Sequence, residues 1–131
     1  MFKQGPIPAF VHGVIEYLAA ALFIAAPFLF PFEDDTATAV SIVVGVLILA
    51  VTASTALPTG LIKSIPVQAH AVIDFLLAAV LIASPFLFGF DDDGTATAFF
   101  IVLGVLHLLI TIGTRFVNEP RPPRQRPTTA D

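Results

Sequence analysis

The feature that most constrains this chain is an internal duplication of a long apolar pattern. Residues 7–56 align with residues 65–115, and 29 of the 50 aligned pairs are identical. The alignment needs one additional residue in the second copy, placed at Gly94. The identical pairs include His, Pro, Asp and Thr, which chance agreement between apolar segments would not supply. The chain is therefore built from two copies of one unit.

Each copy opens with an apolar stretch that prolines bracket at both ends. Pro8 and Pro27 enclose this stretch in the first copy, and Pro66 and Pro85 enclose it in the second. As a helix rising about 1.5 Å per residue, 20 residues span roughly 30 Å, the thickness of the hydrocarbon core of a bilayer. Proline suits the first turn of a helix and disrupts one near its end, so it is expected at both boundaries.

An acidic turn then leads to a second apolar stretch in each copy. These stretches are predicted to be helices over residues 36–57 and 95–117, ended by Pro58 and Pro120. Charged residues make up only 12% of the chain, about half the usual share for a soluble domain. In hydrocarbon the backbone must hydrogen-bond within its own segment, which favours helices over open strands. The soluble alternative, an all-helical bundle, is thereby disfavoured.

The predicted architecture is an all-α, four-helix transmembrane bundle made of two tandem two-helix hairpin repeats. Two hairpins with the same orientation are related by a pseudo-two-fold axis along the membrane normal. The expected segments are a cytoplasmic N-terminus at 1–6, a first transmembrane hairpin at 7–57, a cytoplasmic loop at 58–64, a second transmembrane hairpin at 65–117 and a disordered cytoplasmic tail at 118–131.

Charge predicts the orientation of the bundle in the membrane. All six basic residues fall at the termini or in the central loop, namely Lys3, Lys63, Arg115, Arg121, Arg124 and Arg126. The acidic turns at 33–35 and 91–93 fall on the other side. By the positive-inside bias, we expect a multi-pass protein of the cell membrane with both termini in the cytoplasm.

Two further patterns predict how the helices pack and where they end. Small residues four apart let helices approach closely in a membrane, so Ala21, Ala25, Ala79 and Ala83 are expected at helix contacts together with Gly45 and Gly104. Aromatic residues collect at the interface between lipid and water. The residues expected there, just before each acidic turn, are Phe28, Phe30, Phe32, Phe86, Phe88 and Phe90.

A triplet at the end of the first helix of each copy resembles a family motif. The triplets are Ala26-Pro27-Phe28 and Ser84-Pro85-Phe86. In spacing and hairpin context they resemble the Ser-Pro-Trp signature of the SPW-repeat family of prokaryotic integral membrane proteins, with Phe in the place of Trp and Ala in the place of the first Ser. The resemblance covers residues 7–115 and implies a hairpin architecture. It implies no particular biochemical activity.

Ionisable residues inside the predicted spans are the candidate functional residues. Glu16 and Asp74 occupy matched positions deep in the first helix of each copy, where a charge costs about 3 kcal/mol on insertion scales. His12 and His70 each lie four residues earlier, on the same helix face. If these faces point at the pseudo-two-fold axis, all four groups converge. His107, whose repeat counterpart is Ile48, lies at a similar depth, as does Tyr17.

Three interpretations of this cluster stand side by side. It can be a hydrogen-bonded network that fixes helix register. It can bind a divalent metal through His12, Glu16, His70 and Asp74, since imidazole and carboxylate are suitable ligands; haem held by His12 and His70 is a variant. It can also belong to a proton or ion path, since ionisable residues inside a bundle are the usual parts of a relay.

The remaining sequence points away from catalysis. No serine lies in a Gly-x-Ser-x-Gly context, no glycine-rich phosphate loop occurs, and the chain has no cysteine. We therefore expect a structural or accessory membrane component without enzymatic activity, cofactor or nucleic-acid partner. Its expected partners are the lipid bilayer and either further copies of itself or the other subunits of a membrane complex. The alternative is a metal-binding or proton- or ion-coupled membrane protein that uses the buried cluster.

Overall fold

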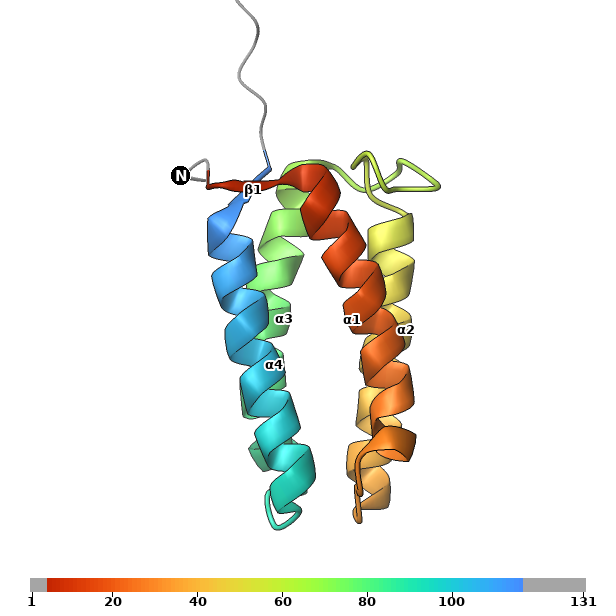
Figure 1. Ribbon diagram of the computed structural model, residues 1–131, viewed down its shortest axis with the longest axis vertical. Coiled ribbons are helices and arrows are strands. Elements are labelled where there is room, and N and C mark those ends of the chain that lie inside the picture. Colours follow the sequence, from red (N-terminus) through yellow and green to blue (C-terminus); the bar gives the residue numbers. More distant parts are fainter. Residues whose placement is uncertain (1–4, 117–131) are drawn as a thin grey trace, which may run out of the picture.

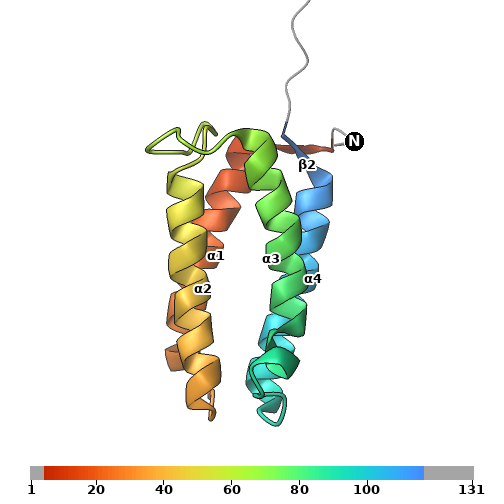
Figure 2. The ribbon, with the colours of Figure 1, turned by 180° about the vertical axis from the view of Figure 1, so that it is seen from behind.

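The computed structural model describes residues 5–116 and shows four helices arranged as two hairpins (Figure 1). The helices are α1 (Ala9–Leu29), α2 (Asp35–Ala53), α3 (Val67–Leu87) and α4 (Gly94–Gly113). Helix α1 packs along α2, and α3 packs along α4, whereas backbone contact between the hairpins is slight (Figures 1 and 2). The predicted tail at 118–131 and most of the N-terminus at 1–6 lie outside the described residues.

Each of the four helices is long and apolar enough to cross a membrane. Their outward faces carry large exposed apolar side chains, among them Leu29, Leu49, Leu76 and Leu109. Such a surface is unfavourable in water and suits contact with lipid. The all-α, four-helix membrane bundle predicted from the sequence is confirmed.

The second helix of each hairpin begins at an aspartate that caps it. The Asp34 side chain accepts hydrogen bonds from Thr36 N at 2.7 Å and Ala37 N at 3.1 Å, and Asp93 accepts one from Ala96 N at 3.1 Å. Such caps satisfy backbone donors that have no partner inside the helix. Asp34 and Asp93 are the N-caps of α2 and α4, so they are equivalent positions of the two repeats. The next residues, Asp35 and Gly94, are then equivalent as well. The additional residue of the second repeat therefore lies earlier in the acidic turn, and its assignment to Gly94 is wrong.

The helix ends differ from those predicted. Helices α1 and α3 each continue two residues beyond Pro27 and Pro85. Proline can occupy the last turn because its missing N–H removes one hydrogen bond without preventing the next residues from remaining helical. Helices α2 and α4 end at residues 53 and 113, four residues before the ends expected from apolar composition.

The early ends of α2 and α4 follow from what the next residues do. The two-residue strands β1 (Ile7–Pro8) and β2 (Thr114–Arg115) pair in parallel, with Ile7 opposite Thr114. An equivalent isolated bridge joins Thr55 to Ile65. Each pairing joins the end of one hairpin to the start of the other. The apolar residues beyond, Leu57 and Phe116, are buried against the bundle and do not extend a helix.

Close helix packing within each hairpin uses a different alanine register from the predicted one. Ala20 and Ala78 are almost fully buried, whereas Ala21 and Ala79 are exposed, so their predicted contact role is wrong. Gly45 and Gly104 are at tight contacts as expected. A Cβ on Gly45 would lie 2.7 Å from the backbone oxygen of Ala20.

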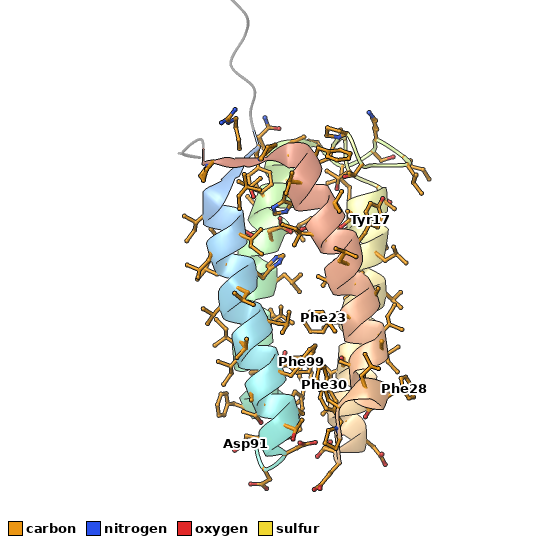
Figure 3. All side chains as sticks on the ribbon, in the orientation of Figure 1. Tyr17, Phe23, Phe28, Phe30, Asp91 and Phe99 are labelled. Carbon is orange, nitrogen blue, oxygen red and sulfur yellow. The ribbon has the colours of Figure 1, made fainter. Side chains whose placement is uncertain are left out.

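The phenylalanines near the acidic turns divide into two groups. Phe28, Phe30, Phe86 and Phe88 are exposed, as expected for an interface with lipid. Phe90, however, is fully buried, and its ring packs at 5.1 Å against that of Phe100. Phe23 of α1 packs against Phe99 and Phe100 of α4, so these rings join the hairpins toward the acidic end (Figure 3). The interface role predicted for Phe90 is wrong because its ring completes the core.

Candidate functional site

Four polar side chains converge between the two hairpins at the end that carries Lys63 and Arg115. His12 and Glu16 come from α1, and His70 and Asp74 come from α3. Nε2 of His12 lies 3.0 Å from Glu16 Oε1 and 3.0 Å from Asp74 Oδ2. Nε2 of His70 lies 3.1 Å from the same Glu16 oxygen and 3.1 Å from the same Asp74 oxygen. The two Nε2 atoms and the two carboxylate oxygens thus form a closed ring, and we call the four residues the quartet.

Both histidines are oriented through their other ring nitrogen. Nδ1 of His12 lies 2.7 Å from the hydroxyl of Thr114, and Nδ1 of His70 lies 2.7 Å from that of Thr55. Each hydroxyl donates its single hydrogen to the carbonyl four residues earlier, at 2.6 Å. A threonine hydroxyl has one hydrogen, so it must accept from Nδ1–H. Each imidazole therefore carries a hydrogen on Nδ1 and directs Nε2 into the ring.

The second oxygen of each carboxylate has different neighbours, and that of Glu16, Oε2, also lies 3.0 Å from Nε2 of His70. Thr52 donates a hydrogen bond to Glu16 Oε2 at 2.7 Å. The equivalent oxygen, Asp74 Oδ1, lies 3.6 Å from Nε2 of His107, too far for a hydrogen bond. His107 Nε2 is buried and has no hydrogen-bond partner among the described residues. The repeat equivalent of Thr52, Thr111, donates instead to the carbonyl of His107 at 2.8 Å, so Glu16 receives a threonine hydrogen bond that Asp74 does not have among the described residues.

The quartet is shielded from both water and lipid. His12 and His70 have no exposed surface, and Glu16 and Asp74 are 3% and 2% exposed. The ring of Phe116 covers the imidazoles, with its centroid 5.0 Å from that of His12 and 6.4 Å from that of His70. Polar groups this deeply buried are costly unless they are paired with one another or with a bound ion.

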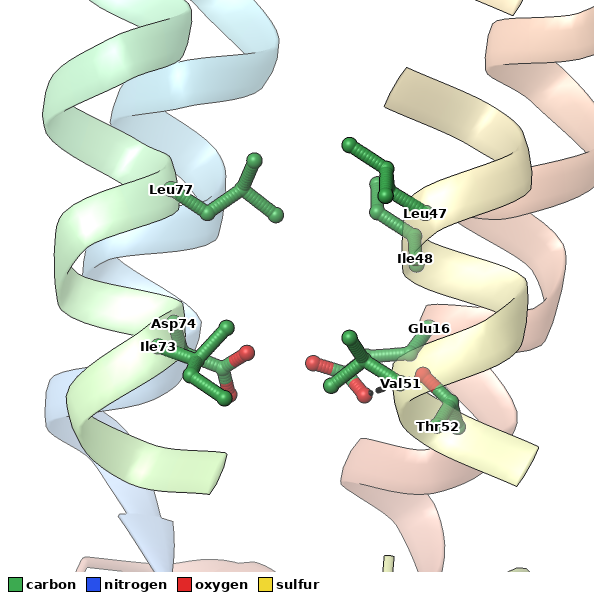
Figure 4. Close-up of a pocket in the computed structure, with 8 residues that line it drawn as sticks. All are labelled: Glu16, Leu47, Ile48, Val51, Thr52, Ile73, Asp74 and Leu77. Atoms are coloured by element: carbon green, nitrogen blue, oxygen red, sulfur yellow. Dashed lines mark hydrogen bonds between the residues drawn. The ribbon is translucent and has the colours of Figure 1, made fainter. Parts of the chain in front are cut away.

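Two apolar cavities flank the quartet between the hairpins. One, of about 180 Å³, lies between α2 and α3 and is lined by Glu16, Asp74 and Leu77 among others (Figure 4). In this view the two carboxylates face each other from opposite hairpins, and Thr52 reaches Glu16. The other cavity, of about 230 Å³, lies between α1 and α4 and is lined by Glu16, His107 and Ile110 among others.

The structure brings four of the predicted residues together and leaves two apart. His12, Glu16, His70 and Asp74 form the quartet, while His107 lies beside it without joining it. Tyr17 points away from the ring and donates a hydrogen bond to the carbonyl of Thr59 at 2.8 Å. Haem does not fit between the histidines, because both carboxylates fill the space between the two Nε2 atoms where a macrocycle would lie.

Sequence reasoning missed the three threonines that support the quartet. Thr52 and Thr55 are identical in the second repeat, as Thr111 and Thr114. A hydroxyl preserved in both copies of an apolar stretch was the available signal. It could not be interpreted from sequence because the partner of each His belongs to the other repeat.

The motif triplets lie away from the quartet, at the acidic end. Phe28 and Phe86 are 77% and 63% exposed, whereas Ala26 and Ser84 are fully buried. Pro85 is buried and Pro27 is partly exposed. The triplet therefore places a small residue inside the bundle and an aromatic ring on its outer surface.

The fold and the tandem repeat define a multi-pass membrane protein of duplicated hairpins. The SPW repeat domain matches residues 10–114, most of the chain, and the protein belongs to this family. The resemblance seen in the two triplets is thus confirmed. No curated protein and no solved structure matches the chain.

A second polar contact joins the hairpins at the acidic end. Besides capping α4, Asp93 accepts hydrogen bonds through Oδ2 from Glu33 N at 2.8 Å and Asp34 N at 3.1 Å in the other hairpin. Burial alone raises the pKa of this carboxyl, but the backbone donors, with Ala96 N first among them, outweigh burial and hold the pKa below its ordinary value.

Proposed function

We propose that this protein is a non-enzymatic structural or accessory component of the cell membrane whose quartet fastens its two hairpins together. The observation that carries this proposal is that each Nε2 contacts carboxylates from both hairpins, at 3.0 to 3.1 Å. Apart from the two short strand pairings, backbone contact between the hairpins is slight. Removing one member of such a buried network leaves its partners unpaired and typically costs about 3–5 kcal/mol.

The proton- or ion-path alternative is less well supported. Toward the acidic end, the buried side-chain hydroxyls of Ser41 and Ser84 both donate to backbone carbonyls, at 2.6 Å. Among residues 5–116, no chain of ionisable side chains links the quartet to the acidic turns. A relay across the membrane normally requires such a series.

Distances between spin labels test the fastening role in the full-length protein. The chain has no cysteine, so labels can be attached at introduced cysteines. Val14 and Val72 are exposed equivalents on α1 and α3 and lie close in sequence to Glu16 and Asp74. We expect one narrow distance distribution in the wild type and a broader, longer one in Asp74→Ala.

A second label pair localises the effect. Phe28 and Phe86 are exposed near the phenylalanine contacts that join the hairpins at the acidic end. We expect their separation to change little in Asp74→Ala, which also shows that the variant remains folded. A narrow, unchanged Val14–Val72 distribution in this folded variant would rule out the fastening role.

We further propose that both termini lie in the cytoplasm, since the central loop with Lys63 and strand β2 with Arg115 lie at one end of the bundle and the acidic turns lie at the other (Figures 1 and 2). Reporter fusions at Asp34 and Lys63 test this orientation. Activity of a cytoplasmic reporter at Lys63 and of an exported reporter at Asp34 is expected. Both reporters responding from the same side would contradict the topology.

A further inference from the structure

We infer that the quartet binds one divalent transition-metal ion, of the zinc, iron and manganese group, between the two repeats. This inference rests on the proposed fastening role and adds the agent that joins the hairpins. Its first support is the donor set. Two imidazole nitrogens and two carboxylate oxygens all lie within 4.8 Å of one another. Imidazole suits zinc, iron and copper, while carboxylate suits the harder ions such as manganese.

The second support is the direction of the histidine lone pairs. Thr55 and Thr114 hold the hydrogen on Nδ1, so Nε2 is the nitrogen free to coordinate. Metal-bound histidines almost always donate their other ring N–H to a fixed acceptor in this way. Because the two threonines are repeat equivalents, the arrangement is built twice. A network that required only register could use either nitrogen.

The third support is the size of the ring. Its four edges from nitrogen to oxygen measure 3.0 to 3.1 Å. If the four atoms stood at the corners of a square with these edges, each would lie about 2.1 Å from the centre, close to the bond lengths of zinc to His and carboxylate ligands.

The fourth support is charge. Two carboxylates carry two negative charges, which a divalent ion neutralises when both imidazoles are neutral ligands. The ion would replace the two protons that otherwise hold the ring together, so the net charge of the buried site stays zero. Neutrality matters because the quartet lies inside a predicted membrane span, where an unbalanced charge is costly.

The neighbours of the two carboxylates also bear on which side chains would bind the metal. Thr52 holds Oε2 of Glu16 at 2.7 Å, and both oxygens of this carboxylate lie within 3.1 Å of Nε2 of His70. His107 is not a ligand in this arrangement, since its Nε2 faces the outer oxygen of Asp74 at 3.6 Å. His107 is therefore the natural control, and Ile is the residue that the first repeat has at this position.

Metal analysis of the full-length protein in detergent provides the test. After incubation with Zn²⁺ and removal of the excess, we expect about one ion per chain in the wild type, and about one in His107→Ile. His12→Ala/His70→Ala should lose most of this ion. The Asp91→Ala/Asp92→Ala variant removes two exposed acidic residues and should retain it. Equal metal content in the wild type and the double histidine variant would overturn the inference.

Variants that retain all four ligands distinguish coordination from simple loss of folding. Thr55→Val and Thr114→Val keep the donor atoms and remove the acceptors that fix the imidazoles. The affinity for Zn²⁺ is expected to fall about 10- to 100-fold in each. X-ray absorption of the zinc-loaded wild type should show two imidazoles in the first coordination sphere. A spectrum without imidazole, or no bound ion, would reject the site.

The metal site and the fastening role can be disproved independently of each other. The Val14–Val72 distance can be measured in chelator-treated wild type and in the zinc-loaded form. If the Val14–Val72 distance is narrowly distributed in both samples and no zinc is bound, the metal site is overturned. The fastening role then stands, with the quartet held together by shared protons. A distribution that stays narrow in folded Asp74→Ala overturns the fastening role itself.

Discussion

The hydroxyl of Thr114 lies 2.7 Å from Nδ1 of His12, although 102 positions separate the two residues in the chain. The same distance joins Thr55 to His70. In both cases the threonine follows the second helix of one repeat and the histidine belongs to the first helix of the other. The repeats therefore complete each other's polar site, which explains why a duplicated hairpin forms one bundle.

Loss of these cross-repeat contacts should destabilise the protein. In Thr114→Val or Thr55→Val, a buried Nδ1–H loses its acceptor, and the expected cost is about 1–3 kcal/mol of unfolding free energy. Denaturant unfolding in detergent measures this change. Thr59→Val is the matched control, because the buried Thr59 hydroxyl has no hydrogen-bond partner among the described residues and its loss should be neutral or stabilising. Equal effects at Thr59 and Thr114 would contradict this account.

The glycines at helix contacts should not tolerate a methyl group. A Cβ on Gly45 would lie 2.6 Å from Cγ1 of Ile24, and one on Gly104 would lie 2.8 Å from Cγ1 of Ile82. Gly45→Ala and Gly104→Ala are expected to cost about 1–3 kcal/mol through displaced packing. In Gly94→Ala, where a Cβ would meet nothing within 4 Å, thermal stability should be unchanged or higher. A Gly45→Ala protein as stable as Gly94→Ala would show that the helices can separate without cost.

Asp93 should contribute more to stability than its neighbours in the acidic turn. Asp93→Ala removes the cap of α4 and the contacts to Glu33 N and Asp34 N, and we expect a loss of about 1–2 kcal/mol. Asp92→Ala removes an exposed carboxylate of the same turn and is the control. Chemical denaturation near pH 7 compares the two, and similar losses would argue against the bridging role.

The contribution of Asp93 should depend on pH with a definite sign. Its folded pKa is below the ordinary value, so the ionised form is favoured by folding. The stabilisation is therefore present above the unfolded pKa, about 4, and is lost as the pH falls through the folded value. The stability difference between the wild type and Asp93→Ala should be constant from pH 5 to 8 and shrink below about pH 4. A difference that grows on acidification would reverse the assigned sign.

Tyr17 should anchor the central loop. Its hydroxyl donates to the carbonyl of Thr59 at 2.8 Å, and its repeat counterpart, Phe75, has no hydroxyl. Tyr17→Phe is expected to cost about 0.5–1.5 kcal/mol and to speed trypsin cleavage after Lys63. Limited proteolysis of the purified protein tests this, with Phe75→Leu as a control that leaves the loop contact in place. Identical cleavage rates in the wild type and Tyr17→Phe would show that the loop is held by other contacts.

The structure also explains which predictions from the sequence were wrong. Apolar composition continues through Leu57, yet α2 ends at Ala53 because Thr55 pairs with Ile65. Apolar composition indicates only that a residue is kept away from water. A lipid-facing helix and a buried extended segment both meet that condition, so composition does not distinguish them. The choice of Ala21 over Ala20 failed because the spacing of Ala21 and Ala25 four apart does not say which face of the helix turns toward its partner.

The sequence by itself determined that this chain forms four membrane-spanning helices in two equivalent hairpins. Hydrophobic length and repetition are properties of the chain that bilayer thickness converts directly into helices. It also placed His12 beside Glu16 and His70 beside Asp74, because residues four apart share a helix face. Only the tertiary structure decided that the two pairs close into one ring and that Thr55 and Thr114 orient it. Those contacts join different repeats, and local periodicity carries no information about how two separate helices turn toward each other.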